Sequence, residues 1–234
     1  MNLQEFESTL AGQTVVIAGN GPGLKNIPFA FLEAYPNFTI NYFHHWTPWL
    51  RPSYWCALDP PCMENMTLDI LQGIPKFVSP WGYEKAKSEG WLSDDGTVIP
   101  LVFDVKIPKM SWARGEQQGV RYGTSILFAS HLAIYMGAKR ILWVGFDCTH
   151  AKKPASKDDL RSGGRSHIPH YYDDQEGLWM KSWCIEAGSF VEWANEQGVS
   201  IINCSIPTAC KSVPLGNYRD YWREPVQHWP PTNI

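Results

Sequence analysis

An apolar segment that runs directly into a glycine-rich turn limits what this chain can fold into more than any other feature. Residues 15–18 are Val, Val, Ile and Ala, and residues 19–24 read Gly-Asn-Gly-Pro-Gly-Leu. The apolar run is short, rich in β-branched side chains and free of alternation, which is typical of a strand buried on both faces of a parallel sheet. The glycines permit positive φ angles and a close approach to the backbone.

In an open α/β sheet, the loop at the carboxyl end of the first strand is a common position for a nucleotide or a phosphate group. The turn at residues 19–24 therefore predicts one wall of a nucleotide-binding crevice. Its spacing is neither that of the dinucleotide fingerprint nor that of a Walker A loop. The alternative is a tight strand-to-helix turn whose glycines serve packing alone.

Short apolar runs alternate with helix-compatible segments along most of the chain. Further strands are expected at residues 38–43, 54–58, 74–78, 141–146 and 199–204, and helices at 3–11, 27–35, 65–72, 124–135 and 178–197. A strand–helix–strand rhythm with short connections favours a parallel sheet. The expected fold class is α/β, with a Rossmann-like single domain over residues 1–234 and a mainly parallel sheet.

Two stretches interrupt this rhythm. Residues 80–120 lack periodicity, apart from one short apolar run at 98–103, and predict an irregular insertion. Residues 148–177 are polar, contain a Gly-Gly pair and end in a dense cluster of His, Tyr and Asp residues. Flexible glycines beside such a cluster are typical of a lid.

Composition excludes several classes of protein. The net charge of −3 gives no global basic field that would indicate nucleic-acid binding. None of the six cysteines forms a Cys-x-x-Cys pair, so we expect neither a structural zinc site nor a disulfide scaffold. The N-terminus does not resemble a signal peptide and no apolar run reaches transmembrane length, so a cytoplasmic protein without a transmembrane segment is expected. Twelve tryptophans suggest aromatic-lined pockets or a homo-oligomer interface.

Polar residues at strand ends are candidates for ligand contacts. Asp59 and Asp147 each follow an expected strand, where side chains of this architecture meet a ligand. Asp59 is equally compatible with a cap on the following turn or helix. Thr124 or Ser125 is placed to cap the helix that follows.

Several short motifs resemble those of bacterial lipooligosaccharide sialyltransferases. The front half of the chain carries the resemblance at residues 15–24, 38–41 and 58–60. The later half carries it at residues 122–125, 145–147, 166–170 and 203–205. The same skeleton is similar to the 6-hydroxymethylpterin diphosphokinase-like family and to a group of uncharacterised phage proteins.

The resemblance implies a metal-independent glycosyltransferase with a Rossmann-like fold that uses a nucleotide-activated sugar and no other cofactor. His170 or His167 would deprotonate the hydroxyl of the acceptor, and Tyr171 and Tyr172 would donate to the departing phosphate. From the residue types alone, a nearby cation, Arg161 or Arg165, also suits the charge on the departing phosphate. The residues that would contact the nucleotide or the donor sugar are Gly19, Asn20, Gly21, Asn41, Asp59, Thr124, Ser125 and Asp147.

The chemistry of these residue types agrees with such roles. Imidazole titrates near neutrality and suits a general base, whereas phenol hydroxyls, loop amides and a guanidinium suit a phosphate leaving group. Asp173 and Asp174 could instead hold a divalent ion, although adjacent acids on a lid are usually solvated.

Three alternatives remain open from the sequence. A pterin diphosphokinase-like enzyme would need Mg²⁺ at Asp59, Asp147 or Asp173. A phage-type transferase would modify a nucleic-acid base in place of a glycan acceptor, with residues 106–121 as the contact surface. A non-catalytic nucleotide-binding protein would need neither lid histidine.

Overall fold

The computed structural model describes residues 1–45, 49–59, 62–64, 68–92, 95–101, 124–148, 176–206 and 208–222. These residues form one seven-stranded sheet of order β5-β4-β3-β2-β1-β6-β7 in which every neighbouring pair is parallel. The strands are β1 (Thr14–Ala18), β2 (Asn37–Ile40), β3 (Tyr54–Ala57), β4 (Lys76–Val78), β5 (Val98–Pro100), β6 (Arg140–Val144) and β7 (Ser200–Asn203). The predicted α/β Rossmann-like fold with a parallel sheet is confirmed.

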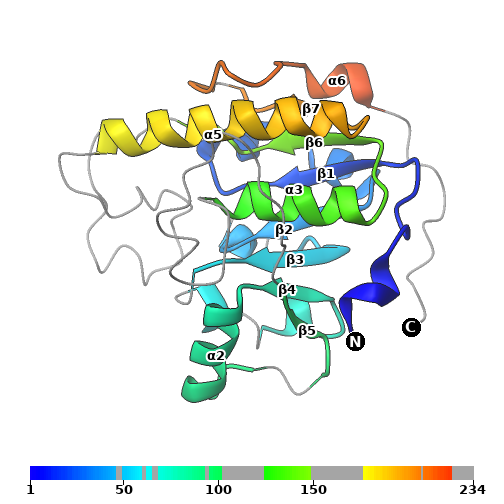
Figure 1. Ribbon diagram of the computed structural model, residues 1–234, viewed down its shortest axis with the longest axis vertical. Helices are drawn as coiled ribbons and strands as arrows, with labels where there is room; N and C mark the ends of the chain where they lie inside the picture. The colour runs from blue at the N-terminus through cyan, green and yellow to red at the C-terminus, as the bar shows by residue number, and fades with distance from the viewer. Residues whose placement is uncertain are drawn as a thin grey trace.

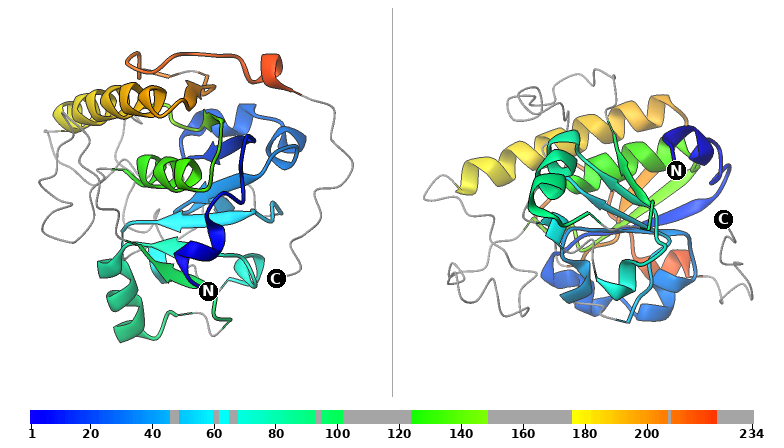
Figure 2. Two further views of the ribbon diagram at one scale, coloured as in Figure 1. Left: turned by 45° about the vertical axis from the view of Figure 1, so that its right-hand side comes forward. Right: turned by 90° about the horizontal axis from the view of Figure 1, so that it is seen from below.

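Helices cover both faces of this sheet (Figures 1 and 2). The α-helices are α1 (Phe29–Glu33), α2 (Pro80–Glu89), α3 (Ser125–Tyr135), α5 (Glu176–Glu196) and α6 (Tyr218–Tyr221). Shorter 3₁₀ segments are η1 (Leu3–Phe6), η2 (Pro22–Asn26), η3 (Phe43–His45) and η5 (Asp69–Leu71). No helix in the described ranges is both long and apolar enough to cross a bilayer.

Alternate residues of the central strands point to two separate cores. Val15 and Ile17 of β1 belong to the core beneath α3, α5 and η1. Val16 and Ala18 belong to the opposite core, beneath η2, α1 and α6. Because both faces are covered, β1 is apolar at consecutive positions, as a buried parallel strand should be.

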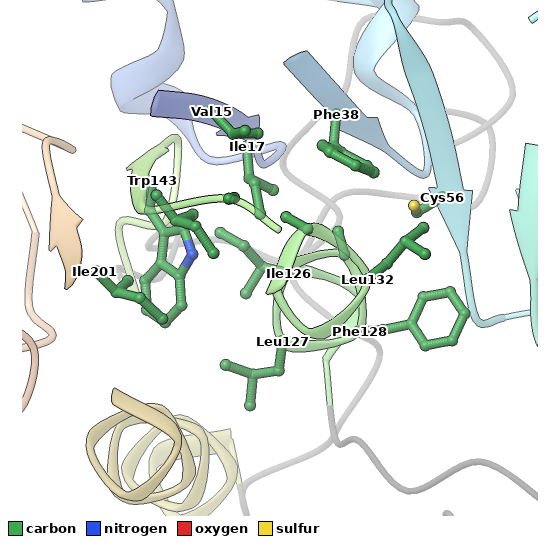
Figure 3. Close-up of a cluster of buried hydrophobic side chains, with 14 of the residues drawn as sticks. Val15, Ile17, Phe38, Cys56, Ile126, Leu127, Phe128, Leu132, Trp143 and Ile201 are labelled. Atoms are coloured by element: carbon green, nitrogen blue, oxygen red, sulfur yellow. The ribbon is translucent and has the colours of Figure 1, made fainter. Parts of the chain in front are cut away.

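Helix α3 is the centre of the larger core (Figure 3). Residues 125–133 are all buried, so the helix is enclosed on every side. Ser130 inside this core is fully paired: its hydroxyl donates to the carbonyl of Ile126 at 2.7 Å and accepts from the indole N–H of Trp143 at 2.8 Å. A helix that is hydrophobic all round is expected only in such a buried position.

The interval 80–120, expected to be irregular, contains regular structure in its described part. Ser79 caps α2 by accepting a hydrogen bond from the amide of Gly82 at 2.9 Å, and Gly90 ends the helix with φ of 73°. β5 then joins the edge of the sheet beside β4. Residues 102–120 lie outside the described residues, as does the part of the lid segment from 149 to 175.

Three smaller expectations also differ from the structure. The helix expected at 3–11 is limited to the 3₁₀ segment η1. The strand expected at 38–43 ends at Ile40, because Asn41 adopts a left-handed conformation with φ of 49°. The helix expected at 65–72 is limited, among the described residues, to the short segment η5.

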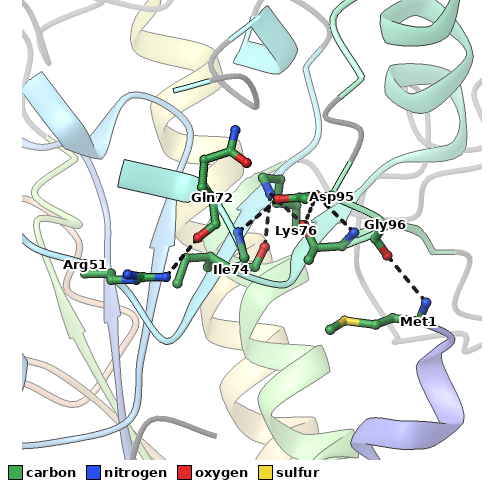
Figure 4. Close-up of polar contacts among 9 residues, drawn as sticks. Met1, Arg51, Gln72, Ile74, Lys76, Asp95 and Gly96 are labelled. Atoms are coloured by element: carbon green, nitrogen blue, oxygen red, sulfur yellow. Dashed lines mark hydrogen bonds and ion pairs between the residues drawn. The ribbon is translucent and has the colours of Figure 1, made fainter. Parts of the chain in front are cut away.

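A buried lysine stabilises the β4–β5 side of the sheet (Figure 4). The Lys76 side chain is fully buried and its ammonium lies 2.8 Å from the carboxylate of Asp95. The ammonium also donates to the hydroxyl of Thr97 at 2.6 Å and to the carbonyl of Ile74 at 3.2 Å. Three acceptors thus compensate for the loss of hydration, although burial still lowers the pKa of Lys76.

Candidate functional site

The order of the strands reverses between β1 and β6. Strands β2 to β5 are added on one side of β1, and β6 and β7 lie on its other side. In open α/β sheets, ligands bind outside the carboxyl ends of the strands at such a reversal. We call this end of the sheet the carboxyl edge. The described site residues predicted from the sequence lie there: Gly19, Asn20, Gly21, Asn41, Asp59, Thr124, Ser125 and Asp147.

The glycine turn after β1 packs directly against the loop that leaves β6. The amide of Gly19 donates to the carbonyl of Val144 at 2.7 Å, and the amide of Gly21 donates to the carbonyl of Gly145 at 2.8 Å. A Cβ atom on Gly19 or Gly21 would lie 2.5 or 2.6 Å from the Gly145 oxygen. These glycines are therefore required for close packing, and their amides are engaged with the β6 loop.

Asp147 fills the space beside this turn. Its side chain is buried, and Oδ2 accepts a hydrogen bond from the amide of Gly23 at 2.5 Å. Burial raises the pKa of Asp147 to about 6, and the hydrogen bond from Gly23 opposes the rise. The buried carboxyl group thus titrates close to neutrality, at the position where the sequence predicted a wall for a nucleotide.

Three buried polar atoms at the carboxyl edge have no hydrogen-bond partner within the described ranges. They are Oδ1 of Asn20, Oγ1 of Thr124 and Oδ1 of Asp147. They come from the exit of β1, the start of α3 and the exit of β6. A buried polar atom without a partner costs about 1–3 kcal/mol, so such atoms mark places where a polar ligand can be bound.

Asn41 and Ser125, which are far apart in the sequence, are joined by a hydrogen bond. The Ser125 hydroxyl donates to Oδ1 of Asn41 at 3.0 Å. The backbone of Asn41 is fixed on both sides, because its amide donates to the carbonyl of Cys56 at 3.0 Å and its carbonyl accepts from the indole of Trp55 at 3.0 Å. Both predicted residues thus belong to one rigid arrangement over the end of β2.

The N-terminus of α3 lies at this same arrangement. Thr124 occupies the N-cap position, but its hydroxyl accepts no hydrogen bond from the helix. The first amide groups of a helix lack partners within the helix and carry a partial positive charge. Together with the Thr124 hydroxyl, which has no partner among the described residues, they form a set of donors suited to an anionic group.

Asp59 lies at the exit of β3 and is exposed. Burial is the main cause that raises the pKa of the nearby Tyr42 hydroxyl, and the Asp59 carboxylate adds to the rise. No hydrogen bond to the Asp59 carboxylate is formed by the described residues, so a cap formed by its side chain is not seen there.

The loop that leaves β6 is supported by the segment after β7. Ser205 Oγ accepts from the Phe146 amide at 2.7 Å, and Thr208 Oγ1 donates to the Phe146 carbonyl at 3.1 Å. The same carbonyl accepts from Nδ2 of the buried Asn203 at 3.2 Å. The small hydroxyl side chains of Ser205 and Thr208 therefore fix the β6 loop.

The five predicted lid residues, Arg165, His167, His170, Tyr171 and Tyr172, lie outside the described residues. The described residues before this segment end at Cys148, and those after it begin at Glu176, the first residue of α5. Since the Cys184 sulfur lies within 4.8 Å of the Cys148 sulfur at the end of β6, the first two turns of α5 extend beyond the carboxyl edge. Both ends of the lid segment therefore start from this edge, and the roles of its residues stay predictions.

Comparison with known proteins gives matches to solved structures, whereas no protein-family model matches the chain and no curated protein matches its sequence. Among solved structures, it is similar to the sialyltransferase CstII from Campylobacter jejuni in complex with cytidine-5'-monophosphate, with a TM-score of 0.51 and 14% identity over 89% of this chain and 86% of that one.

Two further complexes of that sialyltransferase give the same result. The complex with CMP-3FNeuAc has a TM-score of 0.53 at 18% identity, over 87% of this chain and 86% of that one. The complex with a trisaccharide acceptor and CMP has a TM-score of 0.50 at 13% identity, over 87% of this chain and 86% of that one. At such identities the likeness establishes a sialyltransferase-like fold, whereas activity must be argued from the site.

Proposed function

We propose that this protein is a glycosyltransferase that moves a sugar from a nucleotide-activated donor to a hydroxyl group of an acceptor, without a metal ion in the chemical step. The donor nucleotide would bind at the carboxyl edge, between the turn after β1, the start of α3 and the loop after β6. The observation that carries the proposal is the set of unpartnered polar atoms on Asn20, Thr124 and Asp147 within the described part of the chain.

The chemistry of these atoms matches a nucleotide. The Thr124 hydroxyl and the first amides of α3 are donors for a phosphate group. The Asn20 side chain, with an oxygen that has no partner among the described residues, can accept from a ribose hydroxyl or a base amino group. A bound nucleotide sugar would thus satisfy groups that are otherwise costly to bury.

The pair Asn41 and Ser125 provides a fixed contact rather than a flexible one. Its hydrogen bond at 3.0 Å orients the Asn41 amide over the end of β2. Binding to a preorganised amide costs less conformational entropy than binding that must first order a protein loop. This favours a role for Asn41 and Ser125 in holding the nucleotide.

The transfer step requires a base and a stabilised leaving group. His170, or His167, would take the proton from the acceptor hydroxyl, whose oxygen would form a bond to the anomeric carbon as the bond to the donor phosphate breaks. The negative charge released on the phosphate would be offset by Tyr171, Tyr172 and Arg165. The neutral form of the histidine is the active form of the base, and it becomes the imidazolium when the bond has formed.

Nucleotide preference is the first test. In a thermal-shift titration with CMP, UDP, GDP and ATP, we expect one of the first three to raise the melting temperature in buffer without Mg²⁺. Binding at about 100 times the dissociation constant stabilises a protein by about 2.7 kcal/mol, or about 5–11 °C for a chain of this size. A shift seen with ATP alone, and only when Mg²⁺ is added, would contradict the proposal and favour a diphosphokinase.

Transfer is the second test. The matching nucleotide sugar, offered with a panel of glycan hydroxyl acceptors, should release free nucleotide in proportion to the glycosylated product. Addition of Mg²⁺ should leave the rate unchanged. Binding of the nucleotide without turnover of any acceptor would favour the non-catalytic alternative. Equal turnover after both lid histidines are replaced would instead exclude a lid histidine as the base.

A further inference from the structure

Three cysteines from separate segments gather beside the candidate site. The sulfur atoms of Cys148, Cys184 and Cys210 all lie within 4.8 Å of one another. Cys148 follows the exit of β6, Cys184 is on α5, and Cys210 follows β7. Sequence spacing gave no sign of this cluster, because no two of the three residues are neighbours along the chain.

The cluster is held together by bonds of the surrounding backbone. The amide of Ala209 donates to the carbonyl of Asp147 at 2.7 Å, which sets the adjacent residues Cys210 and Cys148 side by side. The hydroxyl of Ser212 donates to the carbonyl of Cys184 and fixes α5 to the same segment. The Cys210 sulfur also lies 3.4 Å from the Ser212 hydroxyl, so these contacts together hold the three sulfur atoms close to one another.

The other three cysteines lie outside the cluster. Cys56, Cys62 and Cys204 are buried in the two cores, where a thiol packs as a small apolar side chain. In the cluster, Cys210 is buried in the core beneath α3 and α5, and Cys148 and Cys184 are partly buried and pack against that core. A single buried thiol can serve packing alone, whereas three thiols that meet at one point also form a set of soft metal ligands.

The geometry agrees with a thiolate metal site. A tetrahedral Zn²⁺ ion with bonds of about 2.3 Å to sulfur separates its ligands by about 3.8 Å. The observed limit of 4.8 Å needs only small side-chain rotations to reach that separation.

We propose that Cys148, Cys184 and Cys210 bind one Zn²⁺ ion, with the fourth coordination position taken by water or by another ligand. Soft thiolates select zinc over the hard cations Mg²⁺ and Ca²⁺. Each thiol that coordinates the ion releases its proton to solvent. The bound ion ties the exit of β6, helix α5 and the segment after β7 together, directly beside Asp147.

The test uses the full-length protein, purified under reducing conditions, stripped with a chelator and desalted. Zn²⁺ is then added against a chromophoric competitor, and Co²⁺ is added in a parallel sample. We expect one Zn²⁺ per chain, a higher melting temperature with Zn²⁺, and the near-ultraviolet charge-transfer band that Co²⁺ gives with thiolates. None of these readouts involves a nucleotide, so the result is independent of the proposed glycosyl transfer.

Cys184→Ser is the informative variant, because Cys184 is partly exposed on a helix and the change keeps the size of the side chain. It should weaken zinc binding by more than the roughly 10–100-fold that loss of an outer-shell partner costs. The matched control, Cys56→Ala, also removes one thiol but at the centre of the sheet, and should bind zinc as the wild type does.

Three results would overturn the proposal. The first is equal zinc affinity in Cys184→Ser and the control. The second is a cobalt spectrum of the wild-type protein without a thiolate band, a measurement that stands even if the variant does not fold. The third is a disulfide between two of the three cysteines, found by mass spectrometry in protein kept under reducing conditions.

Discussion

The carboxylate of Asp147 accepts the backbone amide of Gly23 at 2.5 Å, and so joins the loop after β6 to the turn after β1. This bond crosses the point at which the order of the strands reverses. It places one buried carboxylate, with a pKa raised to about 6 by burial, at the centre of the candidate site.

Replacement of Asp147 by asparagine should change how stability depends on pH. The pKa of Asp147 is about 6 in the folded protein and 3.8 in a free side chain, so the folded state binds more protons between these values. The free energy of unfolding of the wild type should therefore fall as pH rises from about 4 to about 6 and then stay level. An asparagine side chain at this position keeps an acceptor for Gly23 and removes the charge.

The free energy of unfolding of Asp147→Asn should therefore rise relative to that of the wild type between about pH 4 and about pH 6. At pH 8 the difference should be on the order of 1–3 kcal/mol in favour of the variant. Urea unfolding at intervals from pH 4 to pH 8 measures the difference. Asp69→Asn is the control, because it removes one carboxylate at an exposed position on η5, away from Gly23. A difference between Asp147→Asn and wild type that stays constant over the range would contradict the assigned pKa.

Ser125→Ala tests the fixed contact at the end of β2. Loss of its hydrogen bond to Asn41 should weaken binding of the preferred nucleotide by about 2- to 10-fold, as expected for one hydrogen bond. Isothermal titration calorimetry with that nucleotide measures the change. Ser130→Ala on the same helix is the control, because Ser130 bonds within the core to Trp143.

The control should lose about 1 kcal/mol of stability and retain its affinity for the nucleotide. If Ser125→Ala retains full affinity, the nucleotide does not depend on the Asn41–Ser125 pair. If both variants lose affinity equally, the effect is one of general stability.

Single replacements of the lid histidines should separate binding from catalysis. Of His170→Ala and His167→Ala, the one that removes the base should lower the rate of transfer by about 10²–10⁴-fold and leave nucleotide affinity unchanged. The wild-type rate should rise with pH through the usual histidine range near about 6.5, because the base must be neutral. Steady-state rates from pH 5 to pH 9 provide both measurements.

His131→Gln is the matched control for the histidines. His131 is buried on α3, where burial lowers its pKa to about 4, and its ring packs edge-to-face against Trp193. We expect this variant to lose stability without a change in the shape of the pH profile. An unaltered rate in the double variant of His167 and His170 would exclude a lid histidine as the base.

Asp95→Asn should show the cost of leaving a buried lysine without its anion. Removal of one partner of a buried ion pair costs about 3–5 kcal/mol. Lys76 would retain only neutral acceptors, namely the Ile74 carbonyl, the Thr97 hydroxyl and the amide oxygen of the new side chain. Glu89→Gln on α2 is the control, because Lys85 and Glu89 form an exposed pair one turn apart. It should cost less than about 0.5 kcal/mol. Chemical denaturation compares the two, and equal losses would show that Lys76 does not depend on Asp95.

Local patterns in the sequence were sufficient for the fold class and for most of the sheet. The apolar runs of β1 and β6 predict strands buried on both faces, because nearly all of their positions are apolar. Helix α2 was not predicted, because it carries no apolar stripe. Its flanking residues Ser79 and Gly90 are of the types that commonly begin and end a helix. Residues at strand ends were rightly expected at one edge, because parallel strands all end on the same side.

Only the tertiary structure decided what those residues contact. The sequence could not indicate that Asp147 lies against Gly23, that Ser125 bonds to Asn41, or that Cys148, Cys184 and Cys210 meet. Such contacts join segments far apart along the chain, and they depend on the order in which strands enter the sheet. Periodicity and local propensity describe neighbours in sequence, whereas strand order and the packing of loops determine neighbours in space.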